Sequence, residues 1–458
     1  MEDKDTKLKL TFASGAGTVT GANFLLEGNG KKFLIDCGLI QGEQNSDELN
    51  WVPFSYDPSS IDILFVTHAH VDHIGRIPKL IADGFNGRII STIPTRDIVQ
   101  VMLEDTAHLL SHDKEYGLKE IYSEKNIKAA MSLWEGVEYH QEINVDHGFQ
   151  FSFKDSGHIL GSGMLEIIYN GKKIVFTGDL GNSPSPLLND TERITDADYM
   201  IMESVYGDRN HEDRDNRKIE LAKIINDNYK RKGTLMIPVF SLERTQELIF
   251  EMNEMVEAKI VPEMPIFLDS PLAIKLTRIY KTHSRYFKQE VQDLIASGDD
   301  IFHFPGLKMT EETNESKAIL AAPNPKIIMA GSGMSNGGRI IHHEKNYLPN
   351  PNDTLLLIGY QAVGTLGRVI QEGVKNVQIM HQDVPIKARI AVISGYSGHK
   401  DSDHLLEFVA GTAKTLKKVF TVMGEPKAAL FLAQKLKDNL GIKTESPMAG
   451  DTIILDCS

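Results

Sequence analysis

The segment from Thr67 to His73 holds the densest group of metal-binding side chains in the sequence, because it reads Thr-His-Ala-His-Val-Asp-His. Imidazole and carboxylate groups together suit zinc or a similar first-row metal ion. Without a ligand, a short buried turn would hold several polar groups that lack partners, which is costly. The segment therefore predicts a metal site that includes His68, His70, Asp72 and His73.

Three more residues of ligand type follow expected strands, where the same site could collect them. They are Asp36 after the run 32–35, His158 in Ser-Gly-His-Ile-Leu-Gly, and Asp179 in Phe-Thr-Gly-Asp. Taken singly, an aspartate after a strand is as often a turn residue or a helix cap. A single histidine is also often an ordinary loop residue, so only the combination indicates metal binding.

The elements that must position these residues are short β-rich runs that alternate with helical patterns, which is typical of an α/β protein. The metal segment follows a run that ends at Val66 and precedes a helix that begins near Ile74. A helix is expected over 215–232. The expected strands are 32–35, 61–66, 173–176, 199–202, 235–239, 265–268, 326–329, 354–358, 419–422 and 452–455.

In order and setting, Asp36, the 67–73 segment, His158 and Asp179 resemble the four motifs of the metallo-β-lactamase fold. The resemblance continues outside these motifs. Glu203 in Met-Glu-Ser-Val-Tyr-Gly-Asp-Arg is similar to motif A of the β-CASP nucleases. Within that group the chain looks most like the bacterial and archaeal relatives of the endonuclease subunit of the cleavage and polyadenylation specificity factor.

A histidine near the end of the chain completes the likeness. His399 in Ser-Gly-Tyr-Ser-Gly-His-Lys-Asp is similar to motif B of the β-CASP nucleases. The resemblance implies an αββα metallo-β-lactamase sandwich, split into residues 1–207 and 391–458, with an inserted α/β β-CASP domain over 208–390. It also implies that substrate enters between the two domains.

The resemblance further implies two zinc ions per chain. His68, His70 and His158 would hold one ion, Asp72 and His73 the other, and Asp179 would bridge them. Asp36 would orient the loop rather than bind metal.

One expected ligand is absent. The family places a histidine in a His-Gly-Glu sequence after a late strand, whereas this chain has Met423 followed by Gly-Glu. A thioether is a weak ligand for divalent zinc. Water could complete the second site, another residue such as His381 could replace the ligand, or the second ion could bind weakly. We expect a water-completed site of reduced affinity, because three protein ligands still make an open catalytic site.

The same residues predict a chemistry. Hydrolysis of a phosphodiester needs an activated water, charge neutralisation on the phosphoryl oxygens and a proton for the leaving oxygen. Metal ions held by Asp72 and its neighbours can provide the first two. His399 can provide the third as a general acid, with Glu203 orienting its ring and keeping it protonated.

Basic residues on one expected helix are candidates for nucleic-acid contacts. The helical pattern over 272–290 places Lys275, Arg278 and Lys281 on one face, with Arg285 and Lys288 following at the same spacing. The aromatic residues Tyr280, Tyr286 and Phe287 lie between them and could stack on bases. A solvated cationic face is the alternative interpretation.

Two glycine-rich loops could bind phosphate through backbone N–H groups. One spans 331–339 and includes Ser332, and the other spans 359–368. Each could equally be a tight turn between a strand and a helix.

Composition limits the remaining choices. The 458 residues include 49 basic and 63 acidic side chains, a net charge of −14, which argues against binding nucleic acid over the whole surface. With 41% hydrophobic and 24% charged residues, the chain is neither disordered nor membrane-embedded. The presence of only Cys37 and Cys457 fits a reducing compartment, and no apolar run reaches the length of a membrane span, so we expect a cytoplasmic protein.

These observations predict a zinc-dependent, mainly endonucleolytic ribonuclease that acts on single-stranded RNA. The alternatives are a DNA nuclease of the β-CASP group, prompted by Met423, and a catalytically silent RNA-binding subunit. A small-molecule hydrolase of the same fold is disfavoured by Glu203, His399 and the inserted domain. A homodimer is compatible with the resemblance, although no residue identifies an interface.

Overall fold

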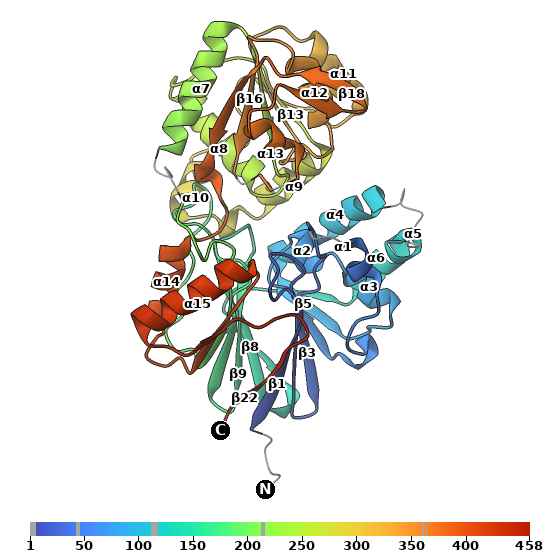
Figure 1. Ribbon diagram of the computed structural model, residues 1–458, viewed down its shortest axis with the longest axis vertical. Helices are drawn as coiled ribbons and strands as arrows, with labels where there is room; N and C mark the ends of the chain where they lie inside the picture. The colour runs from blue at the N-terminus through green and yellow to red at the C-terminus, as the bar shows by residue number, and fades with distance from the viewer. Residues whose placement is uncertain (1–5, 43–45, 111–117, 212–215, 360, 363) are drawn as a thin grey trace. The chain divides into compact units, whose positions relative to one another are not determined.

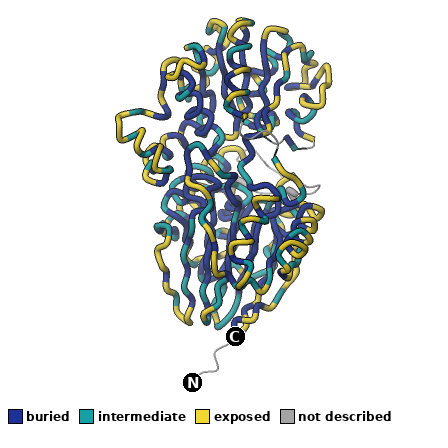
Figure 2. Tube along the Cα trace, turned by 90° about the vertical axis from the view of Figure 1, so that its left-hand side faces the viewer, coloured by how far each residue is buried: buried dark blue, intermediate teal, exposed yellow. Residues whose placement is uncertain are grey.

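The structure is a computed structural model that describes all residues except 1–5, 43–45, 111–117, 212–215, 360 and 363. The chain forms two compact units, Met1–Asn210 with His399–Ser458, and His211–Gly398. Buried residues are dark blue in Figure 2, and in both units they include core residues of the sheets. Among the described residues, no helix combines the length and the apolar character that a membrane crossing requires.

Alternating side chains build the core of the first unit. In β8 (Phe149–Asp155) the side chains of Phe149, Phe151 and Phe153 are buried and the intervening ones are half-buried, the period-two pattern of a strand with one face in a core. Phe33 of the other sheet packs edge-on against the rings of Phe149 and Phe151. The core therefore lies between two sheets that pack face to face.

Each sheet of the first unit has seven strands among the described residues. One sheet has the order β22 (Thr452–Asp456), β1 (Lys7–Ser14), β2 (Asn23–Gly28), β3 (Lys31–Ile35), β4 (Ile63–Phe65), β5 (Arg88–Thr92), β6 (Trp134–Val137). The other has the order β21 (Thr444–Glu445), β20 (Lys418–Val422), β11 (Tyr199–Glu203), β10 (Lys172–Phe176), β9 (Gly163–Tyr169), β8, β7 (Ile143–Val145).

Helices cover the outer faces of this sandwich (Figure 1). α14 (Ser402–Ala410) and α15 (Pro426–Leu440) pack their buried leucines against the outer face of the β10–β11–β20 sheet. The helices beside the other sheet are α1 (Ser46–Trp51), α2 (Val71–Ile74), α3 (Ile77–Ala82), α4 (Ile93–Leu110), α5 (Leu118–Ile121) and α6 (Glu124–Ser132). The expected αββα layers are confirmed.

The second unit contains a six-stranded sheet whose strands are all parallel. Its central strands are continuous apolar runs buried on both faces, as a parallel sheet between helices requires. The order is β14 (Leu307–Met309), β13 (Ile266–Asp269), β15 (Lys326–Ala330), β12 (Thr234–Pro238), β16 (Thr354–Ile358), β19 (Arg389–Ile393). A separate hairpin is formed by β17 (Asn376–Ile379) and β18 (Gln382–Pro385).

The helices of the second unit precede or connect these parallel strands. They are α7 (Arg217–Arg231), α8 (Arg244–Glu257), α9 (Pro271–Thr282), α10 (Gln289–Ala296), α11 (Thr313–Ala318), α12 (Ile340–Tyr347) and α13 (Leu366–Gln371). All ten strands expected from the sequence are present, with ends shifted by at most two residues. The domain boundaries at 207 and 390 stay a prediction; the compact units change at 210 and 398, and β19 pairs with β16 inside the second unit.

The continuous helix expected over 272–290 is wrong. α9 ends at Thr282, a 3₁₀ turn follows at Ser284–Tyr286, and α10 starts at Gln289. The break carries Tyr286 and Phe287 into the interior, where Phe287 packs against the rings of Tyr280 and Phe302. Burial of these aromatic rings therefore overrides the helical spacing of the charges.

Candidate metal centre and acid–base pair

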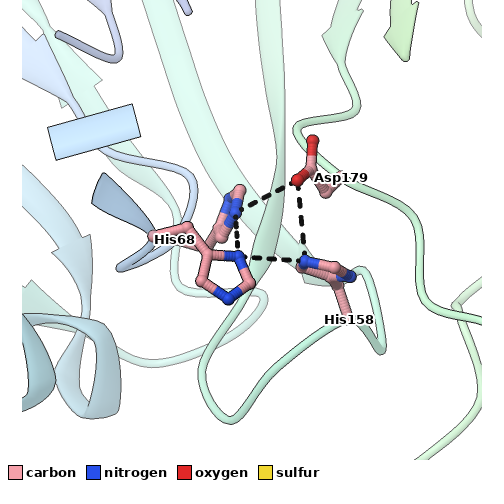
Figure 3. A group of neighbouring side chains, drawn as sticks. His68, His158 and Asp179 are labelled. Carbon is pink, nitrogen blue, oxygen red and sulfur yellow. Dashed lines mark hydrogen bonds and ion pairs between the residues drawn. The ribbon is translucent and has the colours of Figure 1, made fainter. Parts of the chain in front are cut away.

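Four metal-binding side chains converge from three loops that follow β4, β8 and β10. His68 Nε2 lies 3.2 Å from His70 Nδ1, which is also 3.2 Å from His158 Nε2. Asp179 Oδ2 lies 3.3 Å from His68 Nε2 and 3.5 Å from His158 Nε2. Figure 3 shows His68, His158 and Asp179 pointing toward one another. These donor atoms are close enough to surround one ion.

A second group of donors adjoins the first through the other oxygen of Asp179. His73 Nε2 lies 3.4 Å from Asp179 Oδ1 and 3.9 Å from Asp72 Oδ2. Both His73 Nε2 and Asp179 Oδ1 are buried, and neither has a hydrogen-bond partner among the described residues. Buried polar atoms rarely lack partners in a folded protein. These two unpaired donor atoms therefore fit a metal site, because a bound cation would be their partner.

Asp36 orients this second group. Its backbone lies in the left-handed region, with φ of 58°. One carboxylate oxygen accepts a hydrogen bond from Thr67 N, and the other lies 2.7 Å from His73 Nδ1. Holding Nδ1 turns Nε2 of His73 toward Asp179, which is how a carboxylate fixes a metal-binding imidazole.

Burial and charge prepare the ligands for a cation. Burial, assisted by the neighbouring imidazoles, lowers the pKa of both His70 and His158 well below the usual value, so both rings are neutral. Burial alone would raise the pKa of Asp179, but the adjacent His73 and His68 hold it well below the usual value. Neutral imidazole and ionised carboxylate are the states that bind metal, and His70, His158 and Asp179 are in these states. Burial lowers the pKa of His73, but Asp179 and Asp36 outweigh it and raise this pKa well above its usual value, so this ring would lose a proton on binding metal.

The buried Glu203 and the partly exposed His399 form a pair beside this cluster. Glu203 ends β11, and its carboxylate accepts a hydrogen bond from Leu180 N. His399 Nδ1 lies 3.1 Å from Glu203 Oε2 and 4.0 Å from Asp179 Oδ2. Burial lowers the pKa of His399, but the charge and hydrogen bond of Glu203 outweigh it and raise this pKa to about 9. The imidazole consequently carries a proton at neutral pH.

Met423 lies next to the second group without offering a strong donor. Its backbone is left-handed, with φ of 46°, and its N–H donates to Gly15 O. The side chain belongs to the apolar core, and it lines a cavity of about 10 Å³ together with Asp36 and His73. His381 lies in the exposed turn of the β17–β18 hairpin, in the second unit.

The predicted substrate-contacting residues lie in the second unit, whereas the metal group consists of first-unit residues only. On α9, Arg278 pairs with Glu311 and Lys281 pairs with Asp300, so two of the three charges are partly compensated. Lys275 is exposed on the same helix, and Ser332 lies in the loop that follows β15. Residues 360 and 363 of the second glycine-rich loop lie outside the described residues.

The expected base-stacking role of the aromatic residues on this segment is wrong. The side chains of Tyr280, Tyr286 and Phe287 are buried. They pack inside the second unit because burying large aromatic rings removes much apolar area from water. The basic side chains remain the candidates for phosphate contacts.

Sequence reasoning missed Thr67. Its hydroxyl donates to Asp36 Oδ2 and lies 3.1 Å from His68 Nδ1, so it connects the orienting carboxylate to a histidine of the first group. The only sequence signal was its position directly before the histidine-rich segment.

Three families match the chain by sequence. The Metallo-beta-lactamase superfamily matches residues 16–231, the Beta-Casp domain residues 245–370, and the Zn-dependent metallo-hydrolase RNA specificity domain residues 383–447.

Individual proteins match along most of the chain. Ribonuclease TTHA0252 of Thermus thermophilus is 34% identical, over 94% of this chain and 96% of that protein. An RNase J-like protein of Methanocaldococcus jannaschii is 30% identical over 96% and 98%. Transcription termination factor FttA of Methanosarcina mazei is 29% identical over 99% and 72%. A crystal structure of a protein of unknown function from Enterococcus faecalis shares the fold, with a TM-score of 0.60 and 14% identity, covering 98% of this chain and 100% of that one.

Proposed function

Because the chain belongs to the β-CASP group of the metallo-β-lactamase superfamily, we propose that it is a zinc-dependent ribonuclease. It hydrolyses phosphodiester bonds of single-stranded RNA, mainly within the strand. The observation that carries this proposal is the position of Asp179, whose two oxygens face two donor groups and whose neighbour is the His399–Glu203 pair.

Two zinc ions fit the two donor groups. His68, His70 and His158 would hold the first ion, Asp72 and His73 would hold the second, and Asp179 lies beside both groups. When bound, the ions supply Lewis acidity toward phosphoryl oxygens and lower the pKa of water. Asp36 and Thr67 keep the imidazoles in their binding orientation.

His399 supplies the proton that the leaving oxygen needs. In the reaction, a water oxygen forms a new bond to phosphorus while the bond from phosphorus to a sugar oxygen breaks. Because Nδ1 of His399 faces Glu203, the transferred proton is carried on Nε2. Glu203 keeps the imidazolium stable until the transfer, since the two opposite charges lie 3.1 Å apart and the carboxylate is buried.

RNA is favoured over DNA as substrate. The match to an RNA specificity domain and the names of the two relatives of nearly equal length support this choice. Lys275, Arg278, Lys281 and Ser332 are the proposed phosphate contacts, because positive charge and backbone N–H groups bind phosphate. The free cysteines Cys37 and Cys457 suit a reducing compartment, so the cytoplasm is the proposed location.

Cleavage of matched oligonucleotides tests the function. We expect purified protein with zinc to cut a labelled single-stranded RNA internally, to cut DNA of the same sequence much more slowly, and to lose activity with a chelator until zinc is restored. Preferred cleavage of DNA would support a β-CASP DNA nuclease instead. Bound zinc without turnover on either strand would support a silent RNA-binding subunit. Sedimentation of the same sample tests the homodimer.

Met423→His should strengthen the second zinc site. The side chain at position 423 borders the cavity next to His73, and an imidazole there adds a donor that methionine does not provide. We expect wild-type protein to show one tight and one weaker zinc site in a calorimetric titration of apo protein. The variant should show a tighter second site, and Met423→Leu should match the wild type. Two equally tight sites in the wild type would contradict the weakened second site.

A further inference from the structure

The chain passes between its two units twice, at 210–211 and at 398–399, and on the second-unit side both passes reach one buried carboxylate. This carboxylate belongs to Glu251 on α8. Arg217, the first residue of α7 after the first pass, donates from Nε and Nη2 to Glu251 Oε1 at 3.2 and 3.1 Å. Tyr396, shortly before the second pass, donates its hydroxyl to Glu251 Oε2 at 2.5 Å.

Arg217 also contacts the second pass directly. Its Nη1 donates to Gly395 O at 3.3 Å, and its guanidinium lies 4.9 Å from the centre of the Tyr396 ring. The exposed fractions of Arg217, Glu251 and Tyr396 are only 8%, 3% and 1%. Burying two charges is costly unless their hydrogen bonds are satisfied. This cluster satisfies both oxygens of the carboxylate with residues from the two connecting segments.

In the first unit, the residues just before the first pass are hydrogen-bonded to the residues just after the second pass. Asn210 Nδ2 donates to Asp403 Oδ2 at 2.7 Å, and Ser402 N donates to Arg209 O at 3.1 Å. His399 forms an isolated bridge with Gly181 and faces Glu203. Only Ser397 and Gly398 separate the buried Tyr396 of the second unit from His399.

We propose that the Arg217–Glu251–Tyr396 cluster positions His399, with Tyr396 as the positioning residue nearest to it. The inference rests on the proposed role of His399 as general acid. Releasing the Tyr396 ring gives the segment 394–398 more backbone freedom. The imidazole then spends less time in the orientation that protonates the leaving oxygen, while the metal ligands, on other segments, are unaffected.

A comparison of two substrates separates this role from general damage. The sugar oxygen released from RNA needs a proton, whereas the p-nitrophenolate released from bis(p-nitrophenyl) phosphate is stable without one. We expect Tyr396→Phe to lower kcat on RNA about tenfold, with KM and the rate on bis(p-nitrophenyl) phosphate within about twofold of the wild type. His399→Ala should show the same selectivity with a larger loss on RNA. Zinc content should be unchanged in Tyr396→Phe.

Tyr280→Phe is the matched control. Tyr280 is another buried tyrosine of the second unit whose hydroxyl donates to a glutamate, Glu243, but it belongs to α9 and not to either connecting segment. It should retain the wild-type rates on both substrates. Glu251→Gln is the second test variant, because it keeps an acceptor for Tyr396 but removes the charge that Arg217 contacts. It should show the RNA-selective loss too.

The outcomes distinguish the inference from the function on which it rests. Wild-type rates in Tyr396→Phe and Glu251→Gln, or equal losses on both substrates, would overturn the positioning role alone. Wild-type protein that hydrolyses neither substrate would overturn the ribonuclease proposal, and the inference with it. Thermal unfolding of each variant identifies any that fails to fold. If one of Tyr396→Phe and Glu251→Gln does not fold, the rates of the other variant test the positioning role.

Discussion

Replacing Asp179 with alanine should remove most of the bound zinc and lower RNA cleavage by at least about 10³-fold. The reason is that Asp179 faces both donor groups, with Oδ2 near His68 and Oδ1 near His73. Metal ions contribute several kcal/mol to stabilising a phosphoryl transition state, and each 1.4 kcal/mol or so is a factor of ten in rate. Metal analysis of the purified variant and single-turnover cleavage of labelled RNA measure the two effects.

The control for this variant is Asp146→Ala. Asp146 is an exposed aspartate of the same unit, outside the donor groups, so its replacement should leave zinc content and rate unchanged. Full zinc occupancy in Asp179→Ala would contradict the shared position that we assign to this carboxylate. Loss of zinc with undiminished cleavage would contradict the metal dependence of the reaction.

Replacing His399 with alanine should lower RNA cleavage by about 10²- to 10⁴-fold and leave zinc content unchanged. That range is the usual contribution of a positioned general acid. His399 is not part of the first donor group, although its ring centre lies 4.7 Å from that of His158. Its closest charged partner is Glu203 at 3.1 Å, so we expect the ligands to remain in place without it. Initial rates under saturating RNA, together with metal analysis, check both parts of the prediction.

His140→Ala is the control for this variant, because it also removes an imidazole that pairs with a glutamate. His140 pairs with Glu192 at 3.2 Å on the surface of the same unit, is not a member of the donor groups, and should be dispensable. If His399→Ala cleaves RNA at the wild-type rate, the proton must come from another donor. If it loses zinc, the histidine belongs to the metal site instead of the acid–base pair.

Local pattern was enough to predict ten of the strands and the family. The run of histidines and aspartate after β4 is contiguous, so its ligand character can be recognised without any tertiary information. The strands β12, β13, β15 and β16 of the second unit are nearly continuous apolar runs, which is why their positions could be predicted to within two residues. The strands β14, β17, β18 and β19 lack such runs and were not predicted. The family matches confirm the metallo-β-lactamase and β-CASP assignment.

The predicted helix over 272–290 shows where local pattern fails. Charges spaced by three or four residues indicate a helix, and α9 forms as expected up to Thr282. The pattern carries no information on the buried contact of Phe287 with Phe302, because Phe302 lies further along the chain, outside the segment. Tertiary packing therefore ends the helix and removes the aromatic rings from the surface.

The sequence by itself determined which residues can bind metal, because ligand chemistry belongs to the side chain. Only the tertiary structure decided which of these residues lie together in each donor group. Asp179 serves two donor groups because β10 ends beside the loops of β4 and β8, and Glu203 meets His399 across 196 residues of chain. It also decided that Met423 packs into the core beside Gly15. These arrangements depend on pairing between distant strands, and the spacing of neighbouring residues does not encode that pairing.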